Sequence, residues 1–444
     1  MDADQLKGEA DKKPSGRAYM DAIRLLNQLN TQWLTPASPA PPTPEDWQID
    51  NLQRIRWMSE HLLALGIGLE ELERLRVVHV TGSKGKGSVC VCVEAILRRL
   101  GYTTAMRVKP ALVHVRERVK ISGKTLSEEE FARYFFEVYD KIGRGDHSKL
   151  SYKILLHVTT YYVMLKLNVD VAIIEASCGG LYDITNIFPS PWVCAVTSLE
   201  LEHVVTLGNS LESIAWHKFG ILKPGAVALC QSLDSGSAER DKILEVIEKW
   251  SLKRQCPVYA VPSWRENVAT RQPTQFLADT QWKNAALAAQ IARVWIARKE
   301  HGTAEWFESQ PGRLQSMDPF DIPKEFVEAM ENCRFRGRNE VLRTEKITFF
   351  LDCAHTPQSL ELCAKWYAAC TDQSSSTTRA LLFYCSGTKD PARFIQQLLE
   401  GPGFSYALFC PPLAFTDVEN AETQFHDPKK NLAFQVDKCA QAHE

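Results

Sequence analysis

Short apolar runs alternate with longer amphipathic stretches through the middle of the chain. These runs are Val77–Val80, Val169–Ile174, Trp192–Val196 and Ala226–Cys230. Runs of this length that are apolar nearly throughout are typical of strands buried on both faces of a parallel sheet. The stretches between them are long enough for helices. The pattern therefore predicts an α/β fold in which helices cover both faces of the sheet.

A second, smaller α/β unit is predicted toward the C-terminus. Asn284–His301 has small and apolar residues at helical spacing and closes the first unit, and the proline-containing segment Gly302–Lys324 is typical of a linker. The pattern then restarts with strands at Ile347–Leu351, Ala380–Tyr384 and Tyr406–Phe409 and with helices from Pro357 and Pro391. We expect an N-terminal domain at 1–305, a linker at 306–328 and a C-terminal domain at 329–444.

Two segments of biased composition predict loops. Pro36–Pro44 is too rich in proline for a helix or a central strand, and it follows a helix expected at Ala18–Leu34. Ser374–Thr378 consists only of serine and threonine and is typical of a solvated loop. Neither segment carries residues that suggest chemistry.

Composition narrows the class of protein. A chain of 444 residues is long enough for two domains, and a net charge of −2 provides no basic field for nucleic acid. No apolar run reaches the roughly 18 residues that span a bilayer, and the N-terminus resembles neither a secretion signal nor a mitochondrial leader. We expect a cytoplasmic monomer that binds neither membrane nor nucleic acid, with a mitochondrial form as the alternative.

The 13 cysteines are scattered and lack the paired spacing of a zinc site. Several lie within apolar runs, which is typical of reduced, buried thiols. Cys90 and Cys92 fall on a predicted helix, and we interpret both as packing residues.

The strongest motif is Thr81–Ser88, which reads Thr-Gly-Ser-Lys-Gly-Lys-Gly-Ser and lies between a predicted strand and the helical run Val89–Leu100. Its glycines allow backbone N–H groups to turn toward an anion, Lys86 can neutralise terminal phosphates, and Ser88 can place its hydroxyl on Mg²⁺. The spacing departs from the common phosphate loop, and a surface turn rich in glycine and lysine could imitate parts of it. The flanking strand and helix favour nucleotide binding.

Several polar residues near predicted strand ends are candidates for the chemistry, although each has a simpler interpretation. Taken alone, Glu175 is typical of a solvated strand-end acid, His203 of a hydrogen-bonded histidine and Lys218 of a surface lysine. Asp352 and His355, taken alone, are typical of a turn after a strand. For Glu175 and His203, the presence of the phosphate loop reverses this preference and favours a functional interpretation.

Together these motifs resemble those of Mur-type ligases and, because Lys84 lies in the loop, those of folylpolyglutamate synthases. Further matches occur in order along the chain at Tyr19–Asn27, Val113–Val119, Glu175 with Gly179–Asn186, Thr197–His203, Ala215–Gly225, Gln281–Ala288, Gly337–Leu342, Leu351–Thr356 and Ser386–Pro391. The resemblance implies a Mur-ligase-like fold. Its N-terminal phosphate-loop ATPase domain would contain a mainly parallel sheet, and its smaller C-terminal domain would be Rossmann-like.

The resemblance also implies an activity, that of an ATP-dependent amide ligase which adds L-glutamate to tetrahydrofolate or to its polyglutamate tail. In this family a substrate carboxylate attacks the γ-phosphate of ATP, and the resulting acyl phosphate is then displaced by the amine of glutamate. The implied partners are small molecules, namely a folate-like acid, glutamate and ATP.

Site residues follow from the resemblance position by position. Cofactor binding is implied for Thr81, Gly82, Ser83, Lys84, Gly85, Lys86, Gly87, Ser88, Asn284, Arg338, Asp352 and His355. Mg²⁺ is implied on Ser88, Glu175 and His203, and catalytic roles are implied for Lys86, Lys218 and His203. The lysine that matches Lys218 is typically carbamylated in Mur-type ligases, so a carbamate is expected here.

The match weakens in the substrate loop, where the family has Ser-Pro-His and this chain reads Lys109-Pro110-Ala111. Lysine cannot replace a hydroxyl on magnesium. Either a second metal position is altered, or Lys109 supplies charge directly, or the substrate differs from an ordinary folate. Other departures are Glu202 in place of the usual aspartate and Ser177, Cys178 and Cys353 in runs that normally carry glycine.

Two alternatives to the leading function therefore stay open. One is a diverged ligase with the same ATP chemistry that joins another carboxylic acid and amine in specialised metabolism. The other is a catalytically weak paralogue that retains nucleotide binding.

Overall fold

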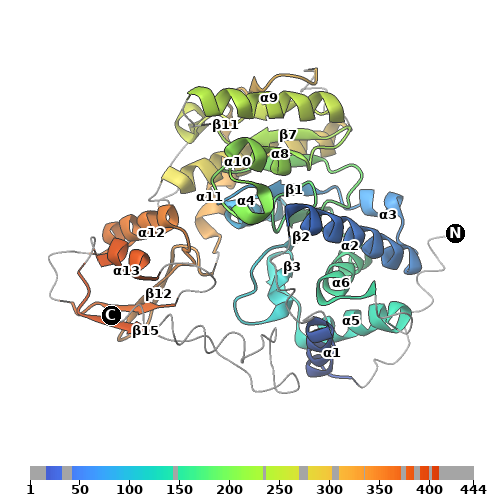
Figure 1. Ribbon diagram of the computed structural model, residues 1–444, viewed down its shortest axis with the longest axis horizontal. Helices are drawn as coiled ribbons and strands as arrows, with labels where there is room; N and C mark the ends of the chain where they lie inside the picture. Colours follow the sequence, from blue (N-terminus) through green and yellow to red (C-terminus); the bar gives the residue numbers. More distant parts are fainter. Residues whose placement is uncertain are drawn as a thin grey trace.

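The computed structural model describes residues 17–32, 43–143, 149–233, 237–269, 279–302, 310–334, 336–371, 377–384, 391–399 and 403–409. A large layered body holds the elements from α1 to α11, and the elements from β12 to β15 form a smaller group beside it (Figure 1). The expectation of two α/β units therefore agrees with the arrangement of the described elements.

A nine-stranded sheet forms the centre of the larger body, in the order β10-β8-β7-β6-β1-β5-β2-β3-β4. Its strands are β1 (Val78–Thr81), β2 (Thr104–Arg107), β3 (Val119–Ile121), β4 (Lys124–Thr125), β5 (Val171–Glu175), β6 (Val193–Val196), β7 (Val227–Cys230), β8 (Val258–Ala260) and β10 (Gln315–Ser316). Neighbours are parallel from β10 to β2, whereas β3 and β4 are added antiparallel. The predicted parallel sheet is confirmed, and the antiparallel extension is new.

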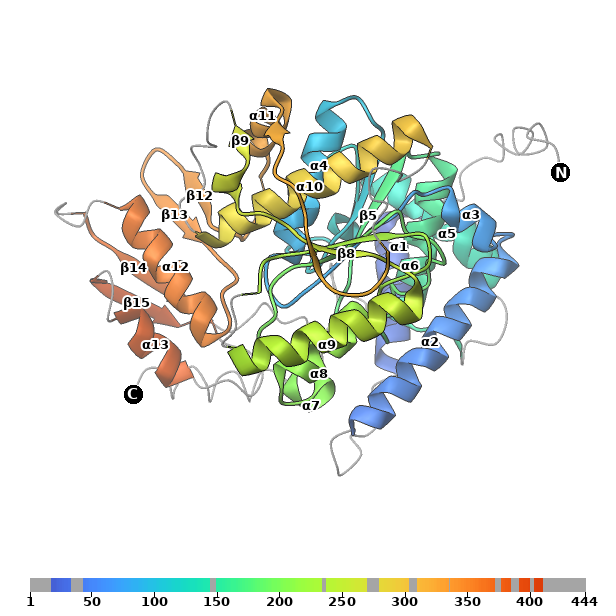
Figure 2. The ribbon, with the colours of Figure 1, turned by 90° about the horizontal axis from the view of Figure 1, so that it is seen from above.

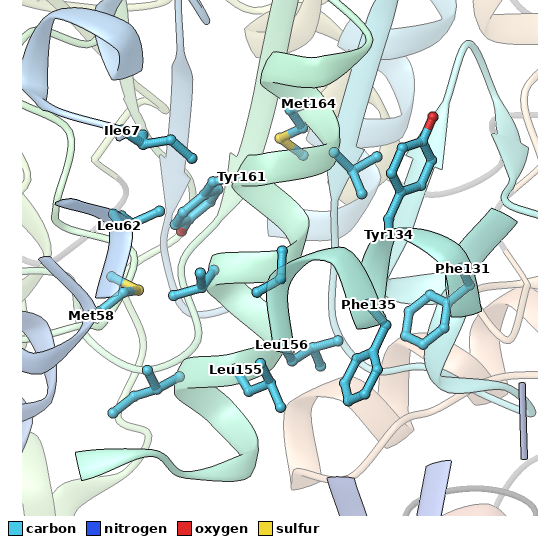
Figure 3. Packing of buried hydrophobic residues seen from close by; sticks show 14 of the residues in the cluster. Met58, Leu62, Ile67, Phe131, Tyr134, Phe135, Leu155, Leu156, Tyr161 and Met164 are labelled. Atoms are coloured by element: carbon cyan, nitrogen blue, oxygen red, sulfur yellow. The ribbon is translucent and has the colours of Figure 1, made fainter. Parts of the chain in front are cut away.

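One face of the sheet packs against α1 (Tyr19–Gln32), α2 (Pro44–Ala64), α5 (Glu128–Ile142) and α6 (Tyr152–Lys166). Ala105 and Ala172 contribute to this cluster from the strands. Figure 3 shows its aromatic centre, where Phe131 and Phe135 of α5 lie close to Leu155 and Leu156 of α6. The N-terminal helices are thus part of the core.

The opposite face packs against α4 (Lys86–Arg99), α10 (Asp279–His301) and α11 (Lys324–Asn332). Met106 and Ile173, which neighbour Ala105 and Ala172 in the strands, contribute here because successive strand residues point to opposite faces. Figure 2 shows α10 running beside α4. The phosphate-loop helix and the N-terminal helices therefore lie on different faces of one sheet.

A third cluster covers β6 and β7 with α8 (Leu211–Phe219) and α9 (Ser237–Arg254). The remaining short elements of the larger body are α3 (Leu69–Glu73), η1 (Val115–Arg118), α7 (Val204–Leu207), η3 (Trp264–Glu266), β9 (Val268–Ala269) and β11 (Asp321–Ile322). Among the residues that the structure describes, no helix has the length and apolarity needed to cross a membrane.

The segment expected to be a linker is structured in its described part. β10 extends the central sheet, β11 pairs with β9, and Phe326 and Val327 of α11 are buried against the α4 face. Just after α11, the Sγ atom of Cys333 lies 4.0 Å from that of Cys92. These contacts attach the segment to the first domain, and the boundaries at 305 and 328 stay a proposal.

The smaller group contains an antiparallel pair, β12 (Glu340–Arg343) with β13 (Thr348–Leu351), and a parallel pair, β14 (Ala380–Phe383) with β15 (Tyr406–Phe409). Helices α12 (Pro357–Cys370) and α13 (Pro391–Leu399) pack through Leu360, Phe383 and Phe394. Proline at the first helical position explains why the starts of both helices were readable in the sequence. Most of Pro36–Pro44, Ser374–Thr378 and Ser386–Pro391 lies outside the described residues.

We predict that Phe135→Ala lowers the free energy of unfolding by about 3–5 kcal/mol, because it removes a ring from a closely packed site. Phe135 is 0% exposed and stacks against Phe131 with 6.1 Å between ring centroids. Chemical denaturation followed by fluorescence measures the change. Phe349→Ala is the matched control, since Phe349 is 44% exposed and should cost far less. Equal costs for the two variants would contradict the packing described.

Candidate active site

The carboxyl ends of parallel strands bring the candidate residues together at one edge of the sheet. β1 lies between β5 and β6, with Val80 opposite Glu175 and Thr81 opposite Val196. The phosphate-loop motif starts where β1 ends, Glu175 ends β5, and the segment that reaches His203 follows β6. Three segments that are far apart in sequence thus meet because of strand register alone.

The loop after β1 has two positions that only glycine fits. Gly82 has φ +143°, and a Cβ there would lie 1.8 Å from Thr197 Oγ1. Gly85 has φ +84°, and a Cβ there would lie 2.3 Å from Asn284 Oδ1. Both contacts are far shorter than real Cβ atoms allow, so the loop is pressed between the segment after β6 and helix α10.

Thr81 and Ser83 anchor this loop. Thr81 Oγ1 donates to the carbonyl of Gly179, and Ser83 donates from its backbone N to Ser198 O at 2.8 Å and from its hydroxyl to Glu200 O at 3.0 Å. Their hydroxyls are therefore engaged with protein. Within the predicted cofactor set, these two side chains shape the loop.

Helix α4 begins inside the motif, at Lys86, and its N-cap Gly85 provides no side-chain cap. The first N–H groups of a helix have no intrahelical acceptor and bind anions readily. Lys86 Nζ donates to the carbonyls of Gly82 at 2.6 Å and Ser83 at 2.9 Å. The ammonium group of Lys86 therefore lies against the loop that leads into the N-terminus of α4.

Glu175 is 5% exposed, and its environment is mostly cationic. Its Oε2 accepts the N–H of Lys109 at 2.8 Å, and its main-chain carbonyl accepts from Arg107 Nη1 at 2.6 Å. Oε1 has no hydrogen-bond partner among the described residues. Burial raises the pKa of Glu175, while the nearby Lys86 charge acts in the opposite direction. The free oxygen is available to a cation at the strand edge.

His203 and Ser88 approach the same edge from other elements. His203 is exposed at the N-cap of α7 with φ +49°, and Ser88 lies half-buried in the first turn of α4. Burial lowers the pKa of His203, and the Lys86 charge adds to this effect. Within the described residues, no three histidine, cysteine, aspartate or glutamate side chains form a metal-binding group. A cation here would depend on the Ser88 hydroxyl and solvent besides Glu175 and His203.

Lys218 is fully buried on α8, so the interpretation of this residue as a surface lysine is wrong. Its Nζ donates to Glu202 Oε1 at 2.8 Å. Burial lowers the pKa of Lys218 to about 8, with the Lys86 charge as a further cause. Burial acts to raise the pKa of Glu202, but the Lys218 and Lys86 charges outweigh it and hold that pKa below its usual value.

The second domain reaches the loop through its own strand-end turn. Lys84 Nζ lies 3.3 Å from His355 Nε2, which joins the two domains directly. Asp352 accepts the N–H of Asn339 at 2.8 Å, and burial raises its pKa against the charges of Arg338 and Lys84. The structure therefore brings together the predicted residues of both domains around the loop.

Some residues of this edge were missed in the sequence. Arg107 ends a strand in the core, and Gln231 Nε2 donates to Asn284 Oδ1 at 2.9 Å. Asp183 accepts the N–H groups of Ser177 and Cys178, both at 2.9 Å, and so shapes the turn after β5. An arginine at the end of a buried strand was the one signal that could have marked Arg107.

Three curated proteins that are similar to this chain are named as folylpolyglutamate synthases, one of them as putative. The mitochondrial folylpolyglutamate synthase of Homo sapiens is 35% identical over 425 residues, which cover 91% of this chain and 70% of that protein. That of Bos taurus is 33% identical with the same coverage. The putative folylpolyglutamate synthase of Caenorhabditis elegans is 33% identical over 449 residues, covering 99% of this chain and 84% of that protein. No family model matches the chain.

Solved structures are similar in fold at lower identity. The apo form of L. casei folylpolyglutamate synthase has a TM-score of 0.65 and 18% identity, covering 96% of this chain and 95% of that chain. A folylpolyglutamate synthase complex with AMPPCP and folate has a TM-score of 0.65 and 19% identity, covering 95% and 94%. The Mycobacterium tuberculosis enzyme with ADP and AMPPCP has a TM-score of 0.61 and 22% identity, covering 82% and 81%. These likenesses establish the shared fold.

We predict that Gly85→Ala weakens nucleotide binding by roughly tenfold or more, because its Cβ would displace Asn284 and distort the loop. Gly101→Ala is the matched control, since Gly101 also has a positive φ, +91°, but faces open space. Isothermal titration calorimetry with a non-hydrolysable ATP analogue measures both affinities. Unchanged affinity in Gly85→Ala would show that the loop tolerates the side chain and would sink the phosphate-cradle assignment.

Proposed function

The chain belongs to the folylpolyglutamate synthase family, and we propose that it is an ATP-dependent ligase which adds L-glutamate to tetrahydrofolate or to its polyglutamate tail. The observation that carries this proposal is the loop at the end of β1, where two positions accept only glycine. This loop lies next to the buried Glu175. This arrangement supplies N–H donors, a lysine and a carboxylate at one sheet edge. Those are the groups that phosphoryl transfer from ATP requires.

In the proposed reaction, the carboxylate of the acceptor attacks the γ-phosphorus of ATP, giving an acyl phosphate and ADP. The amine of glutamate then attacks the acyl carbon, phosphate leaves, and an amide bond forms. The N-terminus of α4 and the Lys86 ammonium group orient and neutralise the phosphates. Lys84, in contact with His355 at 3.3 Å, brings the second domain over the loop.

The residues at this edge fit Mg²⁺. Glu175 presents a carboxylate oxygen without a hydrogen-bond partner in the described part of the chain, and Ser88 and His203 add a hydroxyl and an imidazole. These oxygen-rich donors suit a hard cation. When bound at these residues, Mg²⁺ would supply positive charge that offsets the charge of the phosphates during transfer.

The second domain also protects the reaction from water. An acyl phosphate hydrolyses readily, so a ligase must exclude solvent until the amine arrives. The contact between Lys84 and His355, together with the half-buried Arg338 and Asp352, would cover the loop from the second domain. These residues thus connect nucleotide binding with domain closure.

Lys218 is proposed to be carbamylated in the active enzyme. An amine with a pKa of about 8 is uncharged in roughly a tenth of molecules at pH 7 and can then react with carbon dioxide. The carbamate would replace a cation by an anion, so Glu202, now 2.8 Å away, would have to release its ion pair. The modification therefore depends on charge supplied by Lys86 or by a bound cation.

The two alternative functions and the cellular compartment stay proposals. A diverged ligase for another acid is favoured by one observation, the lysine at position 109 of the substrate loop. A catalytically weak paralogue is disfavoured because Lys86, Glu175 and Lys218 all lie at the edge described. The cytoplasm is the compartment we expect, whereas the human and bovine relatives are named mitochondrial.

We predict that the purified protein, given ATP, Mg²⁺, glutamate and tetrahydrofolate, releases ADP and yields a folate heavier by one glutamate. Lys86→Ala should reduce this rate at least about a hundredfold, because it removes the charge that the phosphates require. Lys124→Ala, at an exposed lysine of β4, is the matched control and should retain full activity. Coupled ADP release and mass spectrometry measure both outcomes. ATP binding without any glutamylated product would redirect the assignment to other acids and amines.

We also predict that Lys218→Ala loses activity and that small carboxylic acids such as acetate restore part of it, because they place a carboxylate where the carbamate would be. Lys218→Arg, which keeps the charge but cannot form a carbamate, should not be rescued. Initial rates with and without added acetate measure the effect. If neither variant responds to acetate, the modification is not supported, and the Lys218–Glu202 ion pair would be the active form.

A further inference from the structure

Two lysines beside the active site have no ion-pair partner in the part of the chain that the structure describes. Lys109 follows the end of β2, and Lys153 lies in the first turn of α6. Both side chains are exposed, yet the surrounding protein desolvates them enough to lower the pKa of each ammonium group. Within the described residues, neither ammonium forms an ion pair or donates a hydrogen bond. A solvent-accessible cation that is crowded by protein and forms no ion pair is available to an anion.

Chain geometry places both lysines at the carboxyl edge of the sheet. α6 ends at Lys166 and β5 begins at Val171, so the helix runs antiparallel to the strand and its first turn lies at the edge where β5 ends. Lys109 is held at the same edge because its N–H donates to Glu175 Oε2 at 2.8 Å. The two lysines also share their surroundings, because the charge of Lys109 lowers the pKa of Lys153 and the charge of Asp183 acts on both.

Asp183, the carboxylate that acts on both lysines, forms no ion pair with either of them. Asp183 is already saturated, because Oδ1 accepts from the N–H and hydroxyl of Thr185 at 3.0 and 2.6 Å and Oδ2 accepts two backbone N–H groups. Arg107 and Arg118 add positive charge close to Lys109. The surroundings of Lys109 and Lys153 thus hold more cations than carboxylates, and an anionic ligand would restore the balance.

We propose that Lys109 and Lys153 form a carboxylate subsite, which holds the glutamate tail of the acceptor while its terminal carboxyl group reaches the phosphate loop. The inference rests on the proposed ligase function. Each γ-linked glutamate carries one free α-carboxylate, so two ammonium groups suit a tail of two or more residues. Both lysines would bind substrate, and neither takes part in phosphoryl transfer.

The position favours the acceptor over ATP. Lys153 belongs to the helix layer that packs with Ala105 and Ala172, whereas the phosphate-loop helix α4 packs on the opposite face with Met106 and Ile173. ATP phosphates already have Lys84, Lys86 and the N-terminus of α4. An acid that approaches from the α6 side would meet the γ-phosphate near Glu175, between the two faces.

The test uses acceptors with one, two and three γ-linked glutamates and compares wild type with Lys109→Ala, Lys153→Ala and the double variant. We expect the KM for the acceptor to rise about tenfold or more in each single variant, with the largest rise for the longest tail. The KM for ATP and kcat should stay unchanged. Lys166→Ala, at the other end of α6, is the matched control, and Lys153→Arg should retain most of the affinity.

An unchanged acceptor KM in the double variant would overturn the subsite, as would a rise confined to the KM for ATP or for glutamate. A second measurement separates this failure from failure of the ligase function. Calorimetry with a free γ-linked glutamate trimer, without ATP, should show binding to wild type and loss of binding in the double variant. Both calorimetric results are expected even if the protein glutamylates no folate. No binding to wild type, or equal binding to both proteins, would overturn the proposal.

Discussion

The active site depends on the register of three parallel strands. Because β1 lies between β5 and β6, the end of β1 is flanked by Glu175 on one side and by Thr197 and Ser198 on the other. The loop after β1 is then pressed so closely against Thr197 and Asn284 that only glycine fits at two positions. Strand pairing thus sets the direction of α4, and the direction of α4 sets where phosphates bind.

Electrostatics builds on this frame. Lys218 and Glu202 are removed from most solvent and pair at 2.8 Å, which offsets the cost of burying each charge. Glu175 has no such ion pair within the described residues and is stabilised by the charges of Lys86 and Arg107 at longer range and by the backbone N–H of Lys109. Several charged groups at this edge of the sheet have few partners within the protein. They can therefore bind phosphates, a cation and the acceptor.

Much of the fold was readable in the sequence, because buried parallel strands are nearly continuous apolar runs. Ala226–Cys230 was expected and β7 is Val227–Cys230, and the helix starts at Pro357 and Pro391 agree with the structure. Strands β3 and β4 were missed because they are short and partly polar, and β10 was read as linker because two residues show no periodicity.

Within the site, the loop and Glu175 could be located from sequence, since local motifs and strand ends mark them. The burial of Lys218 could not be predicted, because its acidic partner, Glu202, lies 16 residues earlier in the sequence. Nor could the lack of an ion-pair partner at Lys153 within the described residues, which depends on how α6 packs in the fold. Contacts between segments distant in sequence leave no local signal.

The two faces of the sheet impose different constraints on this edge. On the α4 side, added side-chain volume is excluded, since a Cβ at Gly82 or Gly85 would overlap Thr197 or Asn284. On the α6 side, Lys109 is held through its backbone N–H, so its side chain can vary without disturbing Glu175. The shape of the phosphate-binding loop is therefore limited by steric exclusion, whereas binding of the acceptor depends on charge. A lysine at position 109 can change which acid is bound and leave the transfer of phosphate intact.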